Sequence, residues 1–244
     1  MSKFAPVAPS ARQPGPLASG DVALLDVEGT TTPIAFVKET LFPYARQRMA
    51  DFVMRHADEP KVADQIAAVA KELGAARPDP AAAVHALIQW ADADRKVTPL
   101  KQLQGMIWRQ GYESGALKGS VFDDAEAALR AWKKRGVRVF IYSSGSVEAQ
   151  KLLFRYSDRG DLLPLIEGHF DTTIGGKLEA KSYATIAARI GIVPGRVMFL
   201  SDHVGEAYAS ADAGMQAVRV HRPGEVPLAN DSWTGATVAT FAGL

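Results

Sequence analysis

The spacing of apolar positions changes twice along the chain. Residues 22–25 form an unbroken apolar run, which is typical of a strand buried on both faces of a sheet. From about residue 36 to residue 118, apolar residues recur instead at intervals of three and four, the period of a helix. Prolines at positions 60, 80 and 99 divide this stretch, so we expect four successive helices with no strand between them.

After residue 118, helical and extended patterns alternate. Strands are predicted at 137–142, 197–200 and 217–220, and helices at 123–134, 147–156, 181–190 and 206–213. Such alternation requires right-handed crossovers and produces a parallel sheet with helices on both faces. The predicted fold class is therefore α/β: a doubly wound parallel sheet with an all-helical cap inserted after the first strand.

The same pattern predicts the domain organisation. Residues 1–17 contain several prolines and no apolar signal-peptide core, and we expect a flexible tail there. Residues 18–33 and 119–244 form the predicted sheet domain. Residues 34–118 form the predicted helical cap.

Polar side chains follow three of the predicted strands. Asp26 and Glu28 come after the first strand, Ser143 and Ser144 after the second, and Asp202 after a later one. The carboxyl ends of parallel strands meet at one edge of a sheet, where ligands bind. Neighbouring carboxylates repel each other there unless a cation or a shared proton relieves them. Three carboxylates provide hard oxygen ligands suited to Mg²⁺, so the sequence predicts a magnesium site.

Phosphate chemistry fits the same strand ends. An aspartate beside a divalent cation can attack phosphorus and form an aspartyl-phosphate, and the cation lets two anions approach each other. The hydroxyls and N–H groups of 143–145 precede a predicted helix and are suited to phosphate oxygens. A lysine would complete the charge balance.

Composition excludes several other functions. The chain has 28 basic and 27 acidic residues, so no charge excess points to a nucleic-acid partner or an anionic membrane. There is no cysteine, which excludes disulfides and thiolate metal sites, and no apolar run approaches the roughly 18 residues of a membrane helix. We expect a cytoplasmic, monomeric enzyme.

The order of these motifs resembles the haloacid dehalogenase superfamily of phosphotransferases. The chain has D-x-E-G-T at 26–30, Ser-Ser at the end of the second strand, a lysine, and Ser-Asp at 201–202. The superfamily usually has D-x-D-G-T. With the glutamate at 28, and with the stretches 26–37, 142–151 and 169–177, the chain resembles the enolase-phosphatases, or acireductone synthases, of methionine salvage. The resemblance covers roughly residues 20 to 225, including 101–105 and 108–109.

This resemblance implies the metal site and the nucleophile. Asp26 would be the nucleophile and a Mg²⁺ ligand. Glu28 would be a catalytic and metal-binding residue in place of the usual second aspartate. Asp202 would be the third ligand, and Glu206 a second acidic residue of that loop that acts through water.

It also implies how phosphate is held. Ser143 and Ser144 would bind the substrate phosphate, and Lys177 would pair with both phosphate and Asp26. From the residues alone Lys181 competes with Lys177, and the resemblance favours Lys177.

The implied reaction has two steps. Proton removal from 2,3-diketo-5-methylthiopentyl-1-phosphate gives an enol phosphate, and dephosphorylation gives the acireductone, 1,2-dihydroxy-3-keto-5-methylthiopentene. The base of the first step is not evident from the residues. We interpret the helical insert as a lid whose polar residues Lys96, Lys101, Gln104 and Arg109 contact the diketone.

Each motif also has a plainer interpretation. The Asp-x-Glu motif at 26–28 could be only a helix-entry cap, and so could Asp202 after its strand. The stretch 143–146 has an ordinary loop composition. Two rival functions follow. The first is a general small-molecule phosphatase with the same nucleophile and no enolase step, and the second is a catalytically silent module whose carboxylates hold an ion.

Overall fold

The computed structural model describes residues 14–225 and 233–244. The chain divides into two compact units, one made of the residues up to Ala35 together with Gly119–Leu244, the other of Phe36–Lys118. Most of the predicted tail, residues 1–13, lies outside the described residues, whereas Leu17 is buried. Within the described residues no helix is both long and apolar enough to cross a membrane.

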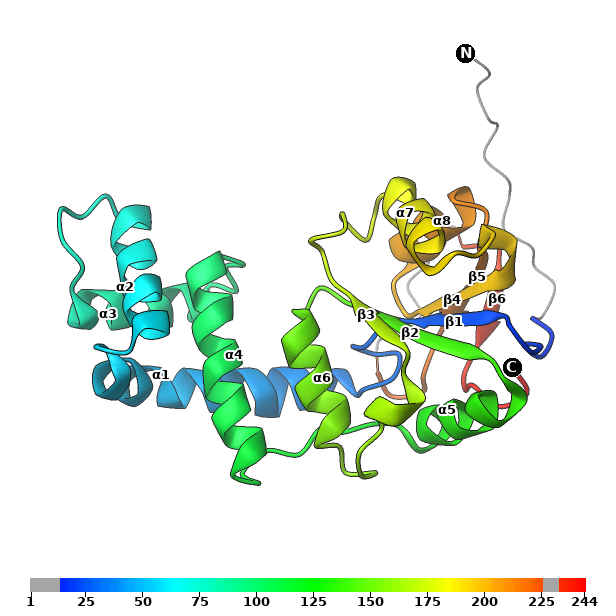
Figure 1. Ribbon diagram of the computed structural model, residues 1–244, viewed down its shortest axis with the longest axis horizontal. Coiled ribbons are helices and arrows are strands. Elements are labelled where there is room, and N and C mark those ends of the chain that lie inside the picture. The colour runs from blue at the N-terminus through cyan, green and yellow to red at the C-terminus, as the bar shows by residue number, and fades with distance from the viewer. Residues whose placement is uncertain (1–13, 226–232) are drawn as a thin grey trace, which may run out of the picture. The chain divides into compact units, whose positions relative to one another are not determined.

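The first unit is built on a parallel sheet of six strands in the order β3-β2-β1-β4-β5-β6 (Figure 1). The strands are β1 (Val22–Leu25), β2 (Arg138–Tyr142), β3 (Gly168–Phe170), β4 (Val197–Ser201), β5 (Gln216–Val220) and β6 (Ala236–Val238). Because β1 lies between β2 and β4, the direction of chain progression reverses at β1. Ligands bind at such switch points in open α/β sheets.

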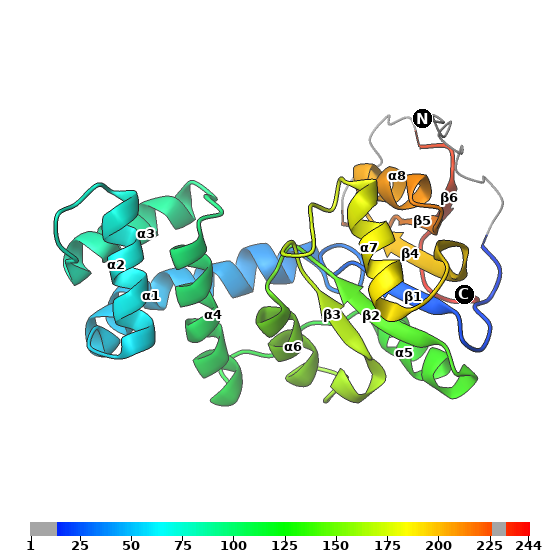
Figure 2. The ribbon, with the colours of Figure 1, turned by 45° about the horizontal axis from the view of Figure 1, so that its top comes forward.

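Four helices cover the two faces of this sheet. They are α5 (Asp123–Arg135), α6 (Val147–Arg155), α7 (Ala180–Ile190) and α8 (Val204–Asp212). The first two lie on one face and the last two on the other (Figures 1 and 2). All four residues of β1 are fully buried, as expected for a strand covered on both sides. The fold-class prediction is confirmed.

Two strands of the sheet were not predicted. Both β3 and β6 are only three residues long, too short to show a period of two. Two short 3₁₀ turns, Leu163–Leu165 and Pro194–Arg196, also escape the pattern.

The second unit is all helical. A π-helical turn (Phe36–Leu41) leads into α1 (Phe42–His56), which is followed by α2 (Pro60–Glu72), α3 (Pro80–Asp92) and α4 (Thr98–Glu113). Each of these four α-helices carries a proline in its first turn, where the missing N–H group is not needed. Trp108 belongs to the core of this unit: it is buried, and its indole N–H donates to the carbonyl of Leu41 at 2.8 Å.

Candidate active site

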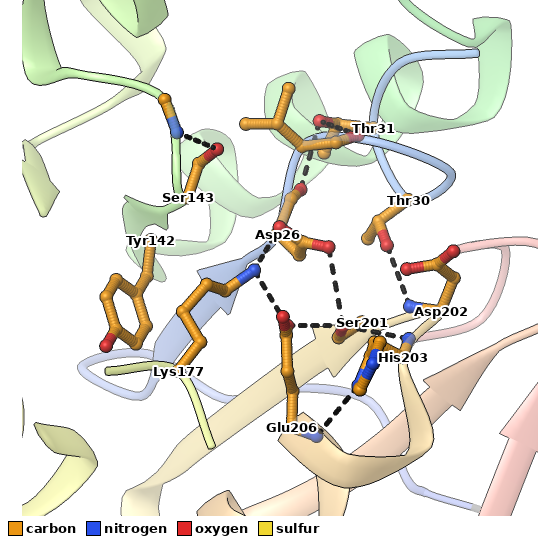
Figure 3. A network of polar contacts seen from close by, with 12 residues as sticks. Asp26, Thr30, Thr31, Tyr142, Ser143, Lys177, Ser201, Asp202, His203 and Glu206 are labelled. Atoms are coloured by element: carbon orange, nitrogen blue, oxygen red, sulfur yellow. Dashed lines mark hydrogen bonds and ion pairs between the residues drawn. The ribbon is translucent and has the colours of Figure 1, made fainter. Parts of the chain in front are cut away.

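The ends of β1 and β4 bring Asp26 next to Ser201. The Asp26 N–H group donates to the carbonyl of Leu200 at 2.9 Å, which continues the pairing of the two strands by one residue. The Asp26 side chain is buried, and the Ser201 hydroxyl lies 3.4 Å from its Oδ2 atom. The loop that follows β4 then carries Asp202 (Figure 3).

Lys177 joins Asp26 to Glu206. Its Nζ atom lies 2.5 Å from Asp26 Oδ1 and 2.7 Å from Glu206 Oε2, and all three side chains are almost fully buried. Figure 3 shows the lysine between the two carboxylates. Glu206 Oε2 also accepts from the Ser201 hydroxyl at 2.8 Å. Lys181, the competing lysine, is exposed on α7.

The charges of this group act strongly on one another. Burial lowers the pKa of Lys177, but the carboxylates of Asp26 and Glu206 raise it more, so the net shift is upward and the lysine stays charged. Burial and the Asp26 charge raise the pKa of Glu206 to about 7, against the opposing effect of Lys177. The Lys177 ammonium is thus paired with two buried carboxylates, those of Asp26 and Glu206. One positive charge does not balance two carboxylates when both are ionised.

Asp202 lies against the loop that follows β1. Its N–H group donates to the Thr30 hydroxyl at 3.0 Å. A Cβ atom on Gly29 would lie 2.5 Å from Asp202 Oδ2, and Gly29 has a φ of +69°. Burial, together with the charges of Asp26 and Glu28, raises the pKa of Asp202 to about 7. The other two predicted carboxylates are thus near enough to act on Asp202.

The loop itself is held by its own backbone. The N–H groups of Thr30, Thr31 and Thr32 all donate to the carbonyl of Val27. The Thr31 hydroxyl donates to the Asp26 carbonyl at 3.1 Å. These bonds fix the turn over residues 27–32, which begins between the two predicted carboxylates at 26 and 28.

The chemistry of these carboxylates fits a hard divalent cation. Asp26, Glu28 and Asp202 provide oxygen atoms only, and a cation would relieve their mutual repulsion. Among residues 14–225 and 233–244, no three His, Cys, Asp or Glu side chains are already arranged around one metal-binding point.

The serine pair after β2 divides into a buried and an exposed residue. Ser143 is buried, and its Oγ atom accepts from the Gly145 N–H group at 3.1 Å. Ser144 is exposed. Ser146 caps α6 by accepting from the Ala149 N–H group at 3.2 Å. The loop therefore combines a fixed backbone with an exposed hydroxyl at the start of a helix.

The four polar residues predicted to contact the diketone differ in exposure. Lys96 is exposed and precedes α4. Lys101 and Gln104 are three residues apart on α4, where they share a face, and Gln104 is buried. Arg109 is exposed on the same helix.

Sequence reasoning missed four hydroxyl groups that contact Glu206 or the loop of Lys177. Ser201 is the last residue of β4 and bonds Glu206, while Tyr142, Ser182 and Tyr183 contact the loop that carries Lys177. Tyr142, Ser182 and Tyr183 lie within ordinary strand and helix patterns. The only available signal for Ser201 was its place directly before Asp202.

Comparison with known proteins shows the family to which this chain belongs. The family model of haloacid dehalogenase-like hydrolases matches residues 21–214. The enolase-phosphatase E1 of Parvibaculum lavamentivorans is 52% identical over 220 residues, which is 90% of this chain and 92% of that protein. The enolase-phosphatase E1 of Danio rerio is 45% identical over 230 residues, 86% of this chain and 88% of that protein.

Solved structures give the same result for the fold. The crystal structure of the UTR4 protein of Saccharomyces cerevisiae is 38% identical, with a TM-score of 0.78, and the match covers 92% of this chain and 99% of that one. CbbY from Rhodobacter sphaeroides, solved with phosphate, shares the fold at 16% identity and a TM-score of 0.55, over 91% of this chain and 95% of that one. The chain belongs to the haloacid dehalogenase-like hydrolases and, among them, to the enolase-phosphatases.

Proposed function

We propose that this phosphatase converts 2,3-diketo-5-methylthiopentyl-1-phosphate to the acireductone 1,2-dihydroxy-3-keto-5-methylthiopentene and phosphate, in methionine salvage. The observation that carries the proposal is the buried contact between Asp26 and Lys177 where β1 and β4 end. A carboxylate nucleophile and a cation for phosphate oxygens stand side by side there. Relatives named enolase-phosphatase, about half identical over nine tenths of the chain, support the choice of substrate.

The phosphatase step is assigned to Asp26. One of its carboxylate oxygens bonds to phosphorus while the bond from phosphorus to the enol oxygen breaks. Water then attacks the aspartyl-phosphate, which releases inorganic phosphate and restores the carboxylate. Lys177, held by Asp26 and Glu206, offers its charge to the phosphate oxygens, and Ser143 and Ser144 offer hydroxyls.

Mg²⁺ is the proposed cation, with Asp26, Glu28 and Asp202 as its protein ligands. When bound, it neutralises phosphate charge and stabilises an enolate oxygen. Burial and the charges of Asp26 and Glu28 raise the pKa of Asp202, and a bound cation would oppose that shift. Glu206 is already bonded to Lys177 and Ser201, which suits an indirect role.

The enolase step is proposed to involve the helical unit. Lys96, Lys101, Gln104 and Arg109 are its candidates for contact with the diketone. Each is tested by substitution with separate assays of enol formation and phosphate release. A variant with both rates unchanged removes that residue from the proposal.

The decisive experiment follows both steps in one reaction. Enzyme, diketo phosphate and Mg²⁺ are mixed while enol absorbance and free phosphate are recorded together. Asp26→Asn should lower phosphate release by about 10³-fold or more, because a carboxamide is a poor nucleophile. The control is Asp64→Asn, at an exposed aspartate of α2, which should leave both signals unchanged. Undiminished phosphate release by Asp26→Asn would remove the assigned nucleophile.

The same assay tests the rival function. A general phosphatase would release phosphate from simple esters, such as p-nitrophenyl phosphate, at rates equal to those with the diketo phosphate. It would also give no enol signal with a substrate whose phosphate cannot be released. Either result would replace the enolase-phosphatase assignment by the broader one.

The proposal includes a monomeric enzyme of the cytoplasm. The substrate is a small phosphorylated molecule, and the near-equal numbers of basic and acidic residues give no overall charge excess that would favour a nucleic acid or an anionic membrane. Light scattering of the purified chain tests the oligomeric state. A mass twice that of the 26.2 kDa chain would replace the monomer by a dimer.

A further inference from the structure

Three hydroxyl groups hold the loop that carries Lys177. The Tyr142 hydroxyl donates to the carbonyl of Gly175 at 2.9 Å, and the Ser182 hydroxyl donates to that of Gly176 at 2.8 Å. The Tyr183 hydroxyl donates to the carbonyl of Lys177 itself at 2.7 Å. Three consecutive carbonyls are therefore each satisfied by a side chain, from the end of β2 and from the first turn of α7.

These hydroxyls take the place of the backbone N–H groups that bond carbonyls in a helix or a sheet but are missing in a loop. Buried carbonyls need a hydrogen bond, and loops usually meet that need with water at the surface. Lys177 is 9% exposed and Gly175 and Gly176 are partly buried, so this stretch of backbone is only partly open to water. The hydroxyls satisfy it there and fix its position at the same time.

The two tyrosine rings are themselves fixed by packing. Both are fully buried, and their centroids lie 5.4 Å apart in an edge-to-face contact. The ring of Tyr183 also meets that of Phe199, on β4, at 4.9 Å. Burial raises the pKa of both phenols, so both remain protonated donors. Rigid rings with a single donor at the tip hold a carbonyl in one place.

A glycine allows the approach of Ser182. Gly175 has a φ of +144°, a conformation that L side chains rarely adopt, and a Cβ atom there would collide with Ser182 Oγ. The short distance between this loop and α7 thus depends on glycine at 175. Lys177 lies two residues after Gly175, so the close approach of Gly175 to Ser182 also helps to set the position of Lys177.

We propose that Tyr142, Ser182 and Tyr183 are positioning residues that act through Lys177, aligning its Nζ atom with Asp26 and with the substrate phosphate. The inference rests on the proposed function, in which Lys177 binds phosphate. The physical basis is that the position of the Lys177 Nζ atom depends on the position of the Lys177 backbone, which these hydrogen bonds fix. A displacement of about 1 Å in a catalytic group can cost about 100-fold in rate.

A purely structural role gives different expectations. Hydroxyls that only stabilise the fold would lower the melting temperature but leave phosphate affinity unchanged in the folded enzyme. Hydroxyls that act through Lys177 would weaken phosphate binding, and their loss would have no further effect once the lysine is gone. A double-mutant cycle separates the two.

The experiment compares Tyr183→Phe, Tyr142→Phe and Ser182→Ala with Thr185→Val. Thr185 is the matched control because its hydroxyl also donates to a carbonyl, that of Lys181 at 2.7 Å, on the same helix but away from the lysine loop. Four quantities are measured: kcat and KM with the diketo phosphate and Mg²⁺, the melting temperature, and the Kd of inorganic phosphate by calorimetry. Tyr183→Phe and Lys177→Met are also combined.

Tyr183→Phe should lower kcat/KM by about 10- to 100-fold and weaken phosphate binding several-fold, whereas Thr185→Val should stay within about twofold. In the Lys177→Met background, Tyr183→Phe should leave the phosphate Kd unchanged. Unchanged kcat/KM and phosphate Kd in all three hydroxyl variants would overturn the proposal. Equal losses with and without the lysine would also overturn it. If Tyr183→Phe does not fold, Tyr142→Phe and Ser182→Ala each remove one bond of the set and take its place in the cycle.

The failure of the proposed function would look different. Wild-type enzyme and Thr185→Val would then both fail to convert the diketo phosphate. Phosphate binding would still decide the positioning role, because it needs no knowledge of the substrate.

Discussion

At the level of single residues, Gly29 meets two requirements at once. Its φ of +69° lies in the left-handed region, and the space where a Cβ atom would stand is taken by the Asp202 carboxylate. An alanine at 29 would therefore strain the backbone and also move a proposed metal ligand. Gly74, with a φ of +67° and nothing within 4 Å, meets only the first requirement.

We expect Gly29→Ala and Gly74→Ala to share a loss of stability and differ in activity. Both should lose about 1 kcal/mol of unfolding free energy for the left-handed conformation. Gly29→Ala should in addition lower kcat about 10-fold or more and raise the Mg²⁺ concentration for half activity, because Asp202 is displaced. Denaturant melts and Mg²⁺ titrations of activity measure the two effects. Equal activity in the two variants would show that Asp202 tolerates the shift.

The charged residues of the site and the serine pair after β2 were accessible to sequence reasoning, and the tyrosines around Lys177 were not. A carboxylate that directly follows a buried strand needs a partner, so Asp26 and Asp202 stand out in the sequence. Lys177 was predicted through a family motif, and in the structure its Nζ atom forms an ion pair with Asp26. The sequence gives no comparable signal for Tyr183, because a tyrosine on the apolar face of a helix is buried whether or not its hydroxyl makes a functional hydrogen bond.

At the level of elements, Gln150 joins α6 to β3 and to the serine loop. Its side-chain NH₂ group donates to the carbonyls of Gly145 at 2.8 Å and Phe170 at 2.9 Å. Its oxygen therefore faces His169, whose Nδ1 lies 3.1 Å away and must be the donor. Burial and, to a smaller degree, the charge of Lys151 lower the pKa of His169 to about 4. The histidine is neutral at pH 7.

This histidine should make the stability depend on pH between about 6.5 and 4. In that window His169 is protonated in the unfolded chain but neutral in the folded chain. The free energy of unfolding therefore falls as the pH falls through 6.5 toward 4. The contribution is on the order of 1–2 kcal/mol, since one pKa unit is about 1.4 kcal/mol and partial exposure screens part of the shift.

His169→Gln should therefore lose less stability than wild type between pH 7 and pH 4.5. Melting temperatures across this range measure the effect, and the carboxylates of the active site cancel because both proteins contain them. His85→Gln, at an exposed histidine of α3, is the control and should follow wild type. Parallel curves for all three proteins would show that His169 titrates normally.

At the level of the whole chain, the sheet could be predicted where its strands are long and buried. The runs that became β1, β2, β4 and β5 are four or five residues of mostly apolar sequence. The strand β6 has only three residues, too few to show a period of two. The segment that contains β6 is held by contacts with residues far away in the sequence. A local sequence pattern cannot show such contacts.

Arg222, which follows β5, contacts the loop after β1. Its Nε donates to the carbonyl of Thr30 at 2.7 Å, and its Nη1 lies 2.8 Å from Asp124 Oδ1. The guanidinium lies over the ring of Phe122 at 4.0 Å and near that of Phe241 at 4.9 Å. Asp124 Oδ2 in turn accepts from the Phe241 N–H group at 2.8 Å. A planar, forked donor is required to meet all of these partners.

Arg222→Lys should therefore destabilise the protein by about 2–4 kcal/mol, because an ammonium cannot donate in two directions and stack as a guanidinium does. The matched control is Arg196→Lys. Arg196 Nε forms an ion pair with Asp21 at the same 2.8 Å, but its side chain is 51% exposed, against 6% for Arg222. That variant should lose no more than about 1 kcal/mol, since water screens the pair. Denaturant unfolding measures both. Equal losses would mean that burial does not decide the strength of these pairs, and that the hold of Arg222 on Thr30 contributes nothing beyond an ordinary surface contact.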